Sequence, residues 1–285
     1  RIKLWPFFLF AAILSGIFYP IVMGWQWGGG WLASIGFSDF AGSTLVHSTG
    51  GAAALAGIMI LGPRFGRFTK SGAPTPIKPF AASSIPLVTI GVFVLWLGWF
   101  GFNGGSQLAL ASFTDAVAIS SIFINTNLAA CGGVLAAAVI TRSIFGKTDV
   151  LQMLNGAIGG LVAITAEPLT PSPFAAILIG SVGGIIVVFG TKLLFSYKLD
   201  DVVGAIPAHL LAGIWGTLAV PLTNTDTTFS TQLIGVLSIN AFVFIVSYIV
   251  WSTMNSLFGI RLSKKAQTKG TDFTETGVIA YAIRD

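Results

Sequence analysis

The stretch DFAGSTLVH, Asp39–His47, decides the fold, because the same pattern recurs as DVVGAIPAH, Asp201–His209. Both fit D-x-x-G-x-x-x-x-H, and they contain the only two histidines in 285 residues. Each pattern lies in a long apolar stretch, where an ionisable side chain is costly and therefore indicates a functional site. The repeat predicts two related helices and marks His47 and His209 as candidate functional residues.

The composition excludes an ordinary soluble domain, because 54% of the residues are hydrophobic and 9% are charged. About eight apolar stretches lie between the charged residues, and most reach the roughly 20 residues that a helix needs to cross a ~30 Å hydrocarbon core. Helices are expected because backbone polar groups find no water in lipid, and continuous apolar runs do not suit a barrel. We therefore predict an all-α integral membrane protein, a helical bundle with spans near residues 5–23, 40–62, 82–102, 116–141, 151–166, 174–196, 203–221 and 230–257. The stretch at 151–166 is short.

Basic residues occur only in every second loop between the predicted spans. The first, third, fifth and seventh loops contain no Lys or Arg. The even-numbered loops carry Arg64, Arg67, Lys70, Lys78, Arg142 and Lys147, with Lys192 and Lys198 flanking the sixth. The positive-inside rule places these loops, Arg1–Lys3 and the basic tail in the cytoplasm. The net charge of +5 follows from this asymmetry, so no nucleic-acid partner is expected.

The two histidines fall in the second and seventh spans, an odd offset that gives their helices opposite polarity. This is the pattern of an inverted-topology repeat, whose functional site lies near the midplane. Each aspartate suits an N-cap, and its histidine follows eight residues later. At 1.5 Å per residue, each imidazole lies about 12 Å into a ~30 Å core, so the two differ by only about 6 Å in depth and can touch. The alternative is that each histidine bonds separately to a carbonyl of a neighbouring helix.

Small residues and a proline accompany the repeat. Gly51 and Gly213 each follow a histidine by four residues, one turn along the same face, and would let the two helices approach. Pro207 indicates a bent or interrupted helix next to His209. Cys131 is expected to be a small core residue, and no disulfide, metal site or cofactor is expected.

Aromatic residues gather at the predicted outer face. The first outer loop contains WQWGGGWL with Trp27, and the third span ends in WLGWFGFNGGS. There Trp99, Phe102 and Ser106 stand at positions i, i+3 and i+7 of one helix face. Aromatic faces attract a small cation, and a hydroxyl can accept a hydrogen bond from it. The alternative is an interfacial aromatic belt.

The combination favours a substrate that is cationic in water and small when neutral. A charged group is expensive to desolvate, so proton loss is the cheaper route through an apolar passage. A buried imidazole pair could pass the proton or bind the neutral species. Ammonium fits this description, and methylammonium is the next candidate.

These motifs resemble those of the ammonium transporter (Amt/Mep) family. The resemblance rests on WGGGWL, on DFAGSTLVHSTGGAAAL followed by GPRFGRF, on GWFGFNGGS and on HLLAGIWG. It implies a non-enzyme of the Amt/Rh type: a homotrimer in the plasma or inner membrane with one pore per subunit. Family members have eleven transmembrane helices, so the eight spans would correspond to the last eight, with three expected upstream of Arg1.

By this resemblance, His47 and His209 match the twin pore histidines that relay protons. Trp27 and Ser106 match members of the outer recruitment site, Phe102 matches a gating phenylalanine, and Trp99 matches a pore-lining residue beneath it. Asp39 matches an aspartate that organises the start of its helix. The sequence departs from many relatives at Gly204, where they carry an aspartate, which affects the expectations around His209.

The resemblance also suggests a division into a transmembrane transporter domain, 1–258, and a cytoplasmic regulatory tail, 259–285. In relatives, such a tail meets a PII-type signalling protein, whereas from its residues alone it is a basic, solvated tail. Two other functions stay open: an ammonium sensor on the same scaffold, and a Rhesus-type ammonia channel. The WGGGW loop with Trp27 argues against the gas channel, because a cation-recruiting site suits ammonium better.

Overall fold

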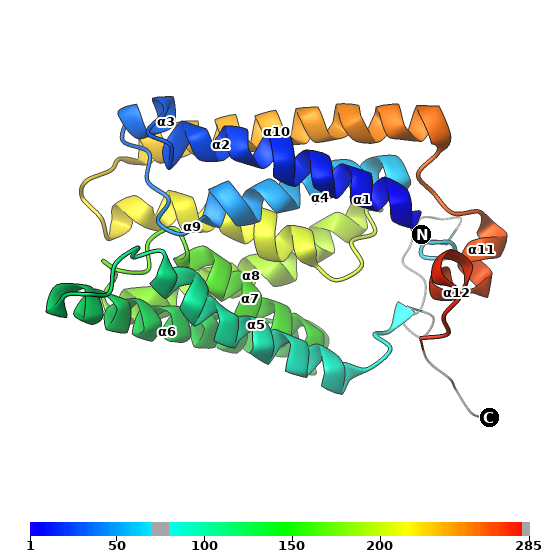
Figure 1. The fold of residues 1–285 in the computed structure, drawn as a ribbon. Helices are drawn as coiled ribbons and strands as arrows, with labels where there is room; N and C mark the ends of the chain where they lie inside the picture. Colours follow the sequence, from blue (N-terminus) through cyan, green and yellow to red (C-terminus); the bar gives the residue numbers. More distant parts are fainter. Residues whose placement is uncertain (70–79, 281–285) are drawn as a thin grey trace.

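The computed structural model describes residues 1–69 and 80–280, and every regular element within them is a helix. The longer helices run side by side in one bundle (Figure 1). Six helical segments of the described residues are long and apolar enough to cross a membrane. They are Leu4–Ser34 (α1 Leu4–Ile13, η1 Leu14–Phe18, α2 Tyr19–Gln26, α3 Trp31–Ser34), Ser43–Leu61 (η2 Ser43–Ser48, α4 Thr49–Leu61), α5 Ile85–Gly105, α6 Phe113–Phe145, α8 Pro173–Ser196 and α10 Phe229–Phe258.

Two apolar segments are shorter: α7, Val150–Ile164, and Ile206–Leu222, which contains η4 Ile206–Leu211, α9 Ala212–Ala219 and η5 Val220–Leu222. The shortness expected at 151–166 is confirmed. The span predicted at 203–221 is also short, because the chain before Ile206 forms a turn around the carboxylate of Asp201 instead of helix. The basic residues Lys70 and Lys78 lie outside the described residues. The molecule is a multi-pass, all-α membrane protein.

Short polar side chains start the long helices. Five of the longer helices begin after a residue whose side-chain oxygen accepts the backbone N–H three positions further on, which satisfies one of the otherwise unpaired amides of the first turn. These residues are Ser84 for α5, Ser112 for α6, Asp149 for α7, Ser172 for α8 and Thr228 for α10. The chain leaves α6 at Gly146, whose φ of +70° is left-handed and ends the helix.

Helices α6, α7 and α8 pack backbone against backbone. A Cβ atom added to Gly156 of α7 would lie 2.6 Å from the carbonyl oxygen of Gly133 in α6. A Cβ atom added to Gly183 of α8 would lie 2.5 Å from the carbonyl oxygen of Gly159 in α7. Where lipid replaces water, such close approach of small residues is the main source of helix–helix attraction. The three helices thus form a closely packed unit beside the histidine helices.

The two histidine segments start at opposite ends of α7. Near one end, the amide of Ala41, just before η2, donates to the carbonyl of Thr165 at 3.0 Å. Near the other end, Asn155 Nδ2 donates to the carbonyl of Val203, just before η4, at 2.9 Å. Ten helical residues separate these contacts, about 15 Å along the axis. The two segments therefore run in opposite directions, as the inverted repeat predicts.

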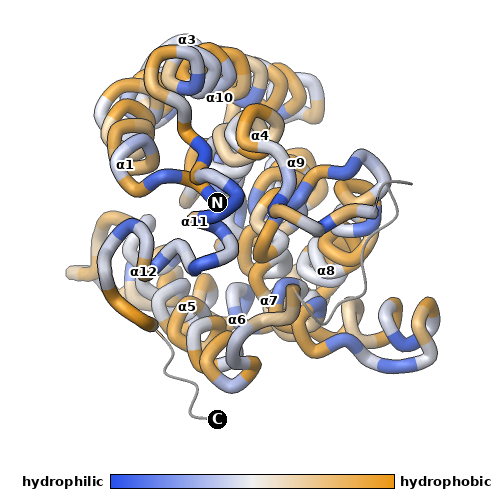
Figure 2. The backbone as a smooth tube through the Cα atoms, turned by 90° about the vertical axis from the view of Figure 1, so that its right-hand side faces the viewer, coloured by the Kyte–Doolittle hydropathy of each residue, from blue (hydrophilic) through white to orange (hydrophobic). Residues whose placement is uncertain are grey.

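The tail packs against the start of the chain at one end of the bundle, where hydrophilic residues gather (Figures 1 and 2). Ile2 and Arg261 form an antiparallel bridge, and the amide of Lys3 donates to the carbonyl of Ile260 at 2.9 Å. Two short helices follow, α11 Lys264–Lys269 and α12 Thr271–Thr276. The guanidinium of Arg261 donates to the carbonyls of Leu61 at 2.8 Å and Pro63 at 2.6 Å. The tail is therefore bonded directly to the end of α4.

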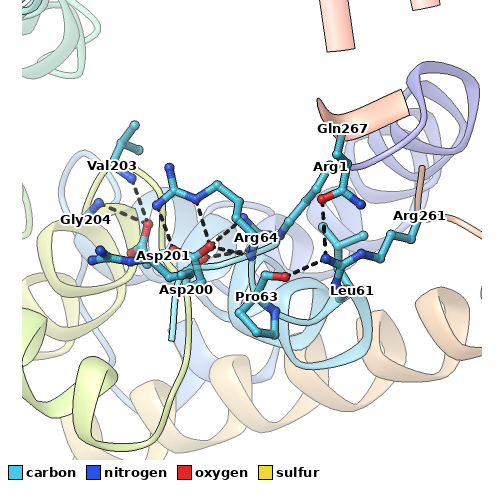
Figure 3. A network of polar contacts seen from close by, with 11 residues as sticks. Arg1, Leu61, Pro63, Arg64, Asp200, Asp201, Val203, Gly204, Arg261 and Gln267 are labelled. Atoms are coloured by element: carbon cyan, nitrogen blue, oxygen red, sulfur yellow. Dashed lines mark hydrogen bonds and ion pairs between the residues drawn. The ribbon is translucent and has the colours of Figure 1, made fainter. Parts of the chain in front are cut away.

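The same end of the bundle holds a buried carboxylate among arginines (Figure 3). Arg64 contacts Asp200 with Nε and a terminal nitrogen, both at 2.8 Å, and Arg1 approaches at 3.3 Å and Arg67 at 3.4 Å. Burial acts to raise the pKa of Asp200, but the hydrogen bonds and charge of Arg64 outweigh it and hold that pKa below its ordinary value. Asp200 thus links the end of the first histidine helix to the start of the second.

Candidate functional site

The two histidines are in direct contact at the centre of the bundle. Their Nδ1 atoms lie 3.3 Å apart, and their ring centroids lie 5.3 Å apart with an interplanar angle of 28°. A neutral imidazole carries one N–H, so one ring donates at Nδ1 and the other accepts. The donor ring then has a bare Nε2 and the acceptor ring has Nε2–H. The pair can therefore accept a proton at one Nε2 and release one from the other.

Both histidines lie on π-helical turns, η2 and η4. Such wide turns inside α-helices occur frequently at functional sites. Gly42, before η2, has a φ of +114°, and a Cβ there would lie within 2.9 Å of the Val46 side chain. Pro207 lies within η4, where the sequence indicated a bend. Local backbone geometry thus sets where each imidazole points.

Asp39 organises the start of η2. Its Oδ1 accepts the amides of Gly42 at 3.0 Å and Ser43 at 2.8 Å, and its Oδ2 accepts those of Thr44 and Leu45, both at 2.8 Å. These are amides of the first turn, which have no partner within the helix. Asp39 is 1% exposed, so the carboxylate serves four donors without water.

Asp201 holds the start of η4 in the same way but less completely. Its Oδ1 accepts the amide of Gly204 at 3.0 Å and that of Val203 at 3.3 Å, and its Oδ2 accepts that of Ile206 at 2.7 Å. Gly204, the position where the sequence departs from many relatives, has a φ of +77°. A Cβ at Gly204 would lie 2.6 Å from Asn155 Nδ2, so the missing side chain leaves room for that amide.

The two glycines of the repeat permit the contact between the histidine helices. A Cβ at Gly51 would lie 2.6 Å from the backbone nitrogen of Leu210. A Cβ at Gly213 would overlap the carbonyl oxygen of Ser43. The close approach expected from the sequence is confirmed.

Aromatic rings from α5 stack on His47. The Trp99 ring lies 4.9 Å from the imidazole at an interplanar angle of 19°, and the Phe102 ring lies 5.4 Å away. The Trp99 and Phe102 rings are 5.9 Å apart. Trp99 is buried, whereas Phe102 is 37% exposed. The structure thus brings together four of the predicted site residues in one stack.

Trp27 and Ser106 lie outside this stack. Among the ring contacts of the described residues, none joins Trp27 to it; the indole Nε1 instead donates to the carbonyl of Asp39 at 2.9 Å. Trp27 is 40% exposed, so part of its side chain is accessible. Ser106 ends α5 and donates its proton to the carbonyl of Phe102 at 2.9 Å. Both residues lie at the Asp39 end of the site.

A cavity of about 230 Å³ borders both histidines, and neither Trp99 nor Phe102 lines it. It is lined by Val46, His47, Gly50, Gly51, Ala54, Ala205 and His209. Four of these residues are glycine or alanine, so the histidines are its main polar feature. The stack, the imidazole pair and the cavity follow one another across the bundle.

Comparison with known proteins identifies the family of this chain. The profile described as Ammonium Transporter Family matches residues 1–281. The chain belongs to the ammonium transporter family. A putative ammonium transporter of Synechocystis is 45% identical over 95% of this chain and 61% of its own length. The Archaeoglobus fulgidus ammonium transporter Amt2 is 37% identical over 99% of this chain and 65% of its own length.

Solved structures of this family share the fold. A protein described as a sensor Amt protein aligns with a TM-score of 0.91 at 30% identity, covering 97% of this chain and 71% of the other. Mep2 of Candida albicans aligns with a TM-score of 0.83 at 30% identity, covering 97% of this chain and 64% of the other. This family member therefore spans about two thirds or less of the length of the two curated relatives above.

Sequence reasoning missed several polar residues that hold the site of this ammonium transporter family member. Gln232 is fully buried near the start of α10 and bonds both the amide and the carbonyl of Ser38, beside Asp39. Thr165 receives a hydrogen bond from Trp99, and Thr44 pairs with Thr217 at 2.7 Å. A usable signal was present, because polar residues in apolar spans are expensive and need partners. Their partners, however, lie far away in the sequence.

Proposed function

We propose that this chain forms a passage for ammonium across a membrane, with His47 and His209 as its proton relay. The observation that carries the proposal is the 3.3 Å contact between the two Nδ1 atoms, made by antiparallel segments of apolar helices. Membership of the ammonium transporter family supports transport as the activity. Methylammonium is the second expected substrate.

The first step is recruitment of the cation at the outer, Asp39 end. The exposed indole of Trp27 offers a π face, which attracts a small cation. Ser106 donates its own proton to Phe102, so its remaining lone pairs can accept a hydrogen bond from ammonium. Phe102 and Trp99 form the gate and the wall between this site and the histidines.

The second step is loss of a proton, because the bare cation is too costly to desolvate in the apolar interior. Ammonium gives one N–H proton to the bare Nε2 of the donor imidazole and becomes ammonia. The Nδ1–H proton shifts to the second imidazole, whose Nε2–H proton leaves on the far side. Ammonia, with one proton fewer and no charge, passes separately into the cavity.

Replacing His47 tests this relay. We expect His47→Ala to abolish the proton-coupled ammonium current of the natural protein reconstituted on supported membranes, because the Nδ1 contact is lost. Ser247→Ala is the matched control, since Ser247 is a buried polar residue of α10 away from the stack. Undiminished current and unchanged selectivity in His47→Ala would refute the relay.

We also propose the assembly and sidedness that the family suggests. Residues 1–258 would form the transmembrane domain of a homotrimer in the plasma or inner membrane, and residues 259–285 a cytoplasmic tail. The alternation of basic loops supports this sidedness. The bonding of Arg261 to the end of α4 supports a regulatory tail, for which a PII-type protein is the candidate partner.

An ammonium sensor is the second candidate. It is favoured by the TM-score of 0.91 with the protein described as a sensor Amt protein. Saturable flux in liposomes would favour transport, whereas ammonium binding without flux would favour sensing. A Rhesus-type gas channel agrees less well with a cation site at Trp27.

A further inference from the structure

Trp99 is held by a hydrogen bond that its indole donates to Thr165, the residue that ends α7. Its indole Nε1 donates to Thr165 Oγ1 at 2.8 Å, and both side chains are buried. The Thr165 hydroxyl donates its own proton to the carbonyl of Leu161 at 2.7 Å. A hydroxyl has one proton, so Thr165 can only accept from the indole. The direction of the bond is therefore fixed.

This bond determines how the indole lies on His47. The two rings are nearly parallel, 19° apart, with centroids separated by 4.9 Å. Turning the indole to break its bond with Thr165 would also break the stack. A flat indole restricts rotation of the imidazole and offers its π face to the positive charge that His47 carries when it is protonated.

The same turn of α7 holds the start of the His47 segment. The carbonyl of Thr165 accepts the amide of Ala41 at 3.0 Å, and the carbonyl of Val162 accepts the hydroxyl of Ser43 at 2.6 Å. One helix end thus fixes both the backbone before His47 and the ring that covers its face. The Ala41 bond uses the backbone carbonyl of Thr165 and does not depend on its side chain. A change in the Thr165 side chain therefore affects only the bond to the Trp99 ring.

We propose that Thr165 is a positioning residue for the histidine relay: its hydroxyl sets the plane of Trp99, and Trp99 sets the plane of His47. The proposal rests on the relay function proposed above and assigns it a residue that touches neither the substrate nor the imidazoles. Thr165 acts on the passage of the proton and not on recruitment, since Trp27 and Ser106 lie outside the stack.

Thr165→Val tests this role, because valine keeps the branched shape and removes the hydroxyl. We expect the maximal ammonium current to fall about three- to tenfold, the range that loss of one hydrogen bond gives, with an unchanged half-saturating concentration. Thr165→Ser, which keeps the hydroxyl, should retain the current of the natural protein. The control is Thr141→Val, because Thr141 is equally buried and bonds the carbonyl of Ala137 in α6. It should leave the current unchanged.

A double-mutant cycle separates positioning from general stability. Trp99→Phe removes the N–H donor, so adding Thr165→Val to it should cause no further loss. Additive losses, or full current in Thr165→Val, would overturn the proposal. His47→Ala, measured in parallel, distinguishes failure of the proposed relay from failure of the proposed positioning role. If it abolishes the current while Thr165→Val does not reduce it, the relay stands and the positioning role fails; if His47→Ala has no effect, the relay itself fails.

Discussion

Replacing Asp39 with asparagine tests whether a buried carboxylate builds the His47 segment. In the structure, each carboxylate oxygen accepts two backbone amides, at 2.8 to 3.0 Å. Asparagine keeps one oxygen and turns an NH₂ group toward the other two amides. Because Asp39 is 1% exposed, water cannot replace the lost acceptor. Two of the four hydrogen bonds are therefore lost outright.

The magnitude follows from these bonds. A hydrogen bond to a charged group contributes about 1.5–3 kcal/mol, so Asp39→Asn should lower the free energy of unfolding by about 3–6 kcal/mol. At roughly 2–4 °C per kcal/mol for a chain of this size class, the Tm should fall by roughly 6–24 °C. The current should fall with it, because η2 carries His47.

Asp201→Asn provides the matched comparison. The NH₂ group of the asparagine can take the place of Oδ2, which accepts only one backbone N–H. The remaining oxygen then keeps the two hydrogen bonds of Oδ1. The expected loss is then about 1.5–3 kcal/mol, half that of Asp39→Asn. Thermal unfolding of purified protein in detergent measures both, and supported-membrane current measures the consequence. An equal Tm for Asp39→Asn and the natural protein would refute the capping argument, and so would a larger loss in Asp201→Asn.

Two further predictions concern the ends of the pathway. Trp27→Leu should raise the half-saturating ammonium concentration several-fold by removing the π face, whereas Trp31→Leu, an equally exposed neighbour, should not; an unaltered concentration dependence would count against recruitment at Trp27. Asp200→Asn should lower the Tm, because it removes the carboxylate that bonds the guanidinium of Arg64 and faces the buried Arg1, at a cost of about 3 kcal/mol. Since the pKa of Asp200 is depressed, its contribution is complete above its ordinary value and is lost as pH falls through the lower, folded-state value. The difference in Tm between the natural protein and Asp200→Asn should be constant above about pH 5 and shrink below about pH 4. A difference that is as large at pH 3 as at pH 5 would contradict this.

Local sequence signals were sufficient for six of the eight predicted spans and for the two aspartate caps, whereas the stretches at 151–166 and 203–221 form shorter apolar helices. The Asp39 and Asp201 motifs marked two helix starts because a short acidic side chain can bond amides only a few residues away. The i, i+3, i+7 spacing placed Trp99 and Phe102 on one face, and both rings contact His47. These contacts depend on helix geometry within a few turns, which the sequence specifies directly.

The sequence by itself therefore determined an apolar helical bundle, the alternation of basic residues between its loops, and the opposite polarity of the two histidine helices. Only the tertiary structure decided that the imidazoles meet through their Nδ1 atoms, that Thr165 holds Trp99 and that Gln232 holds Ser38. The reason is physical: these bonds join residues 66 to 194 positions apart, and their directions depend on how whole helices pack. Side-chain type predicts that a buried polar group must find a partner, but only the packed bundle determines which partner it finds.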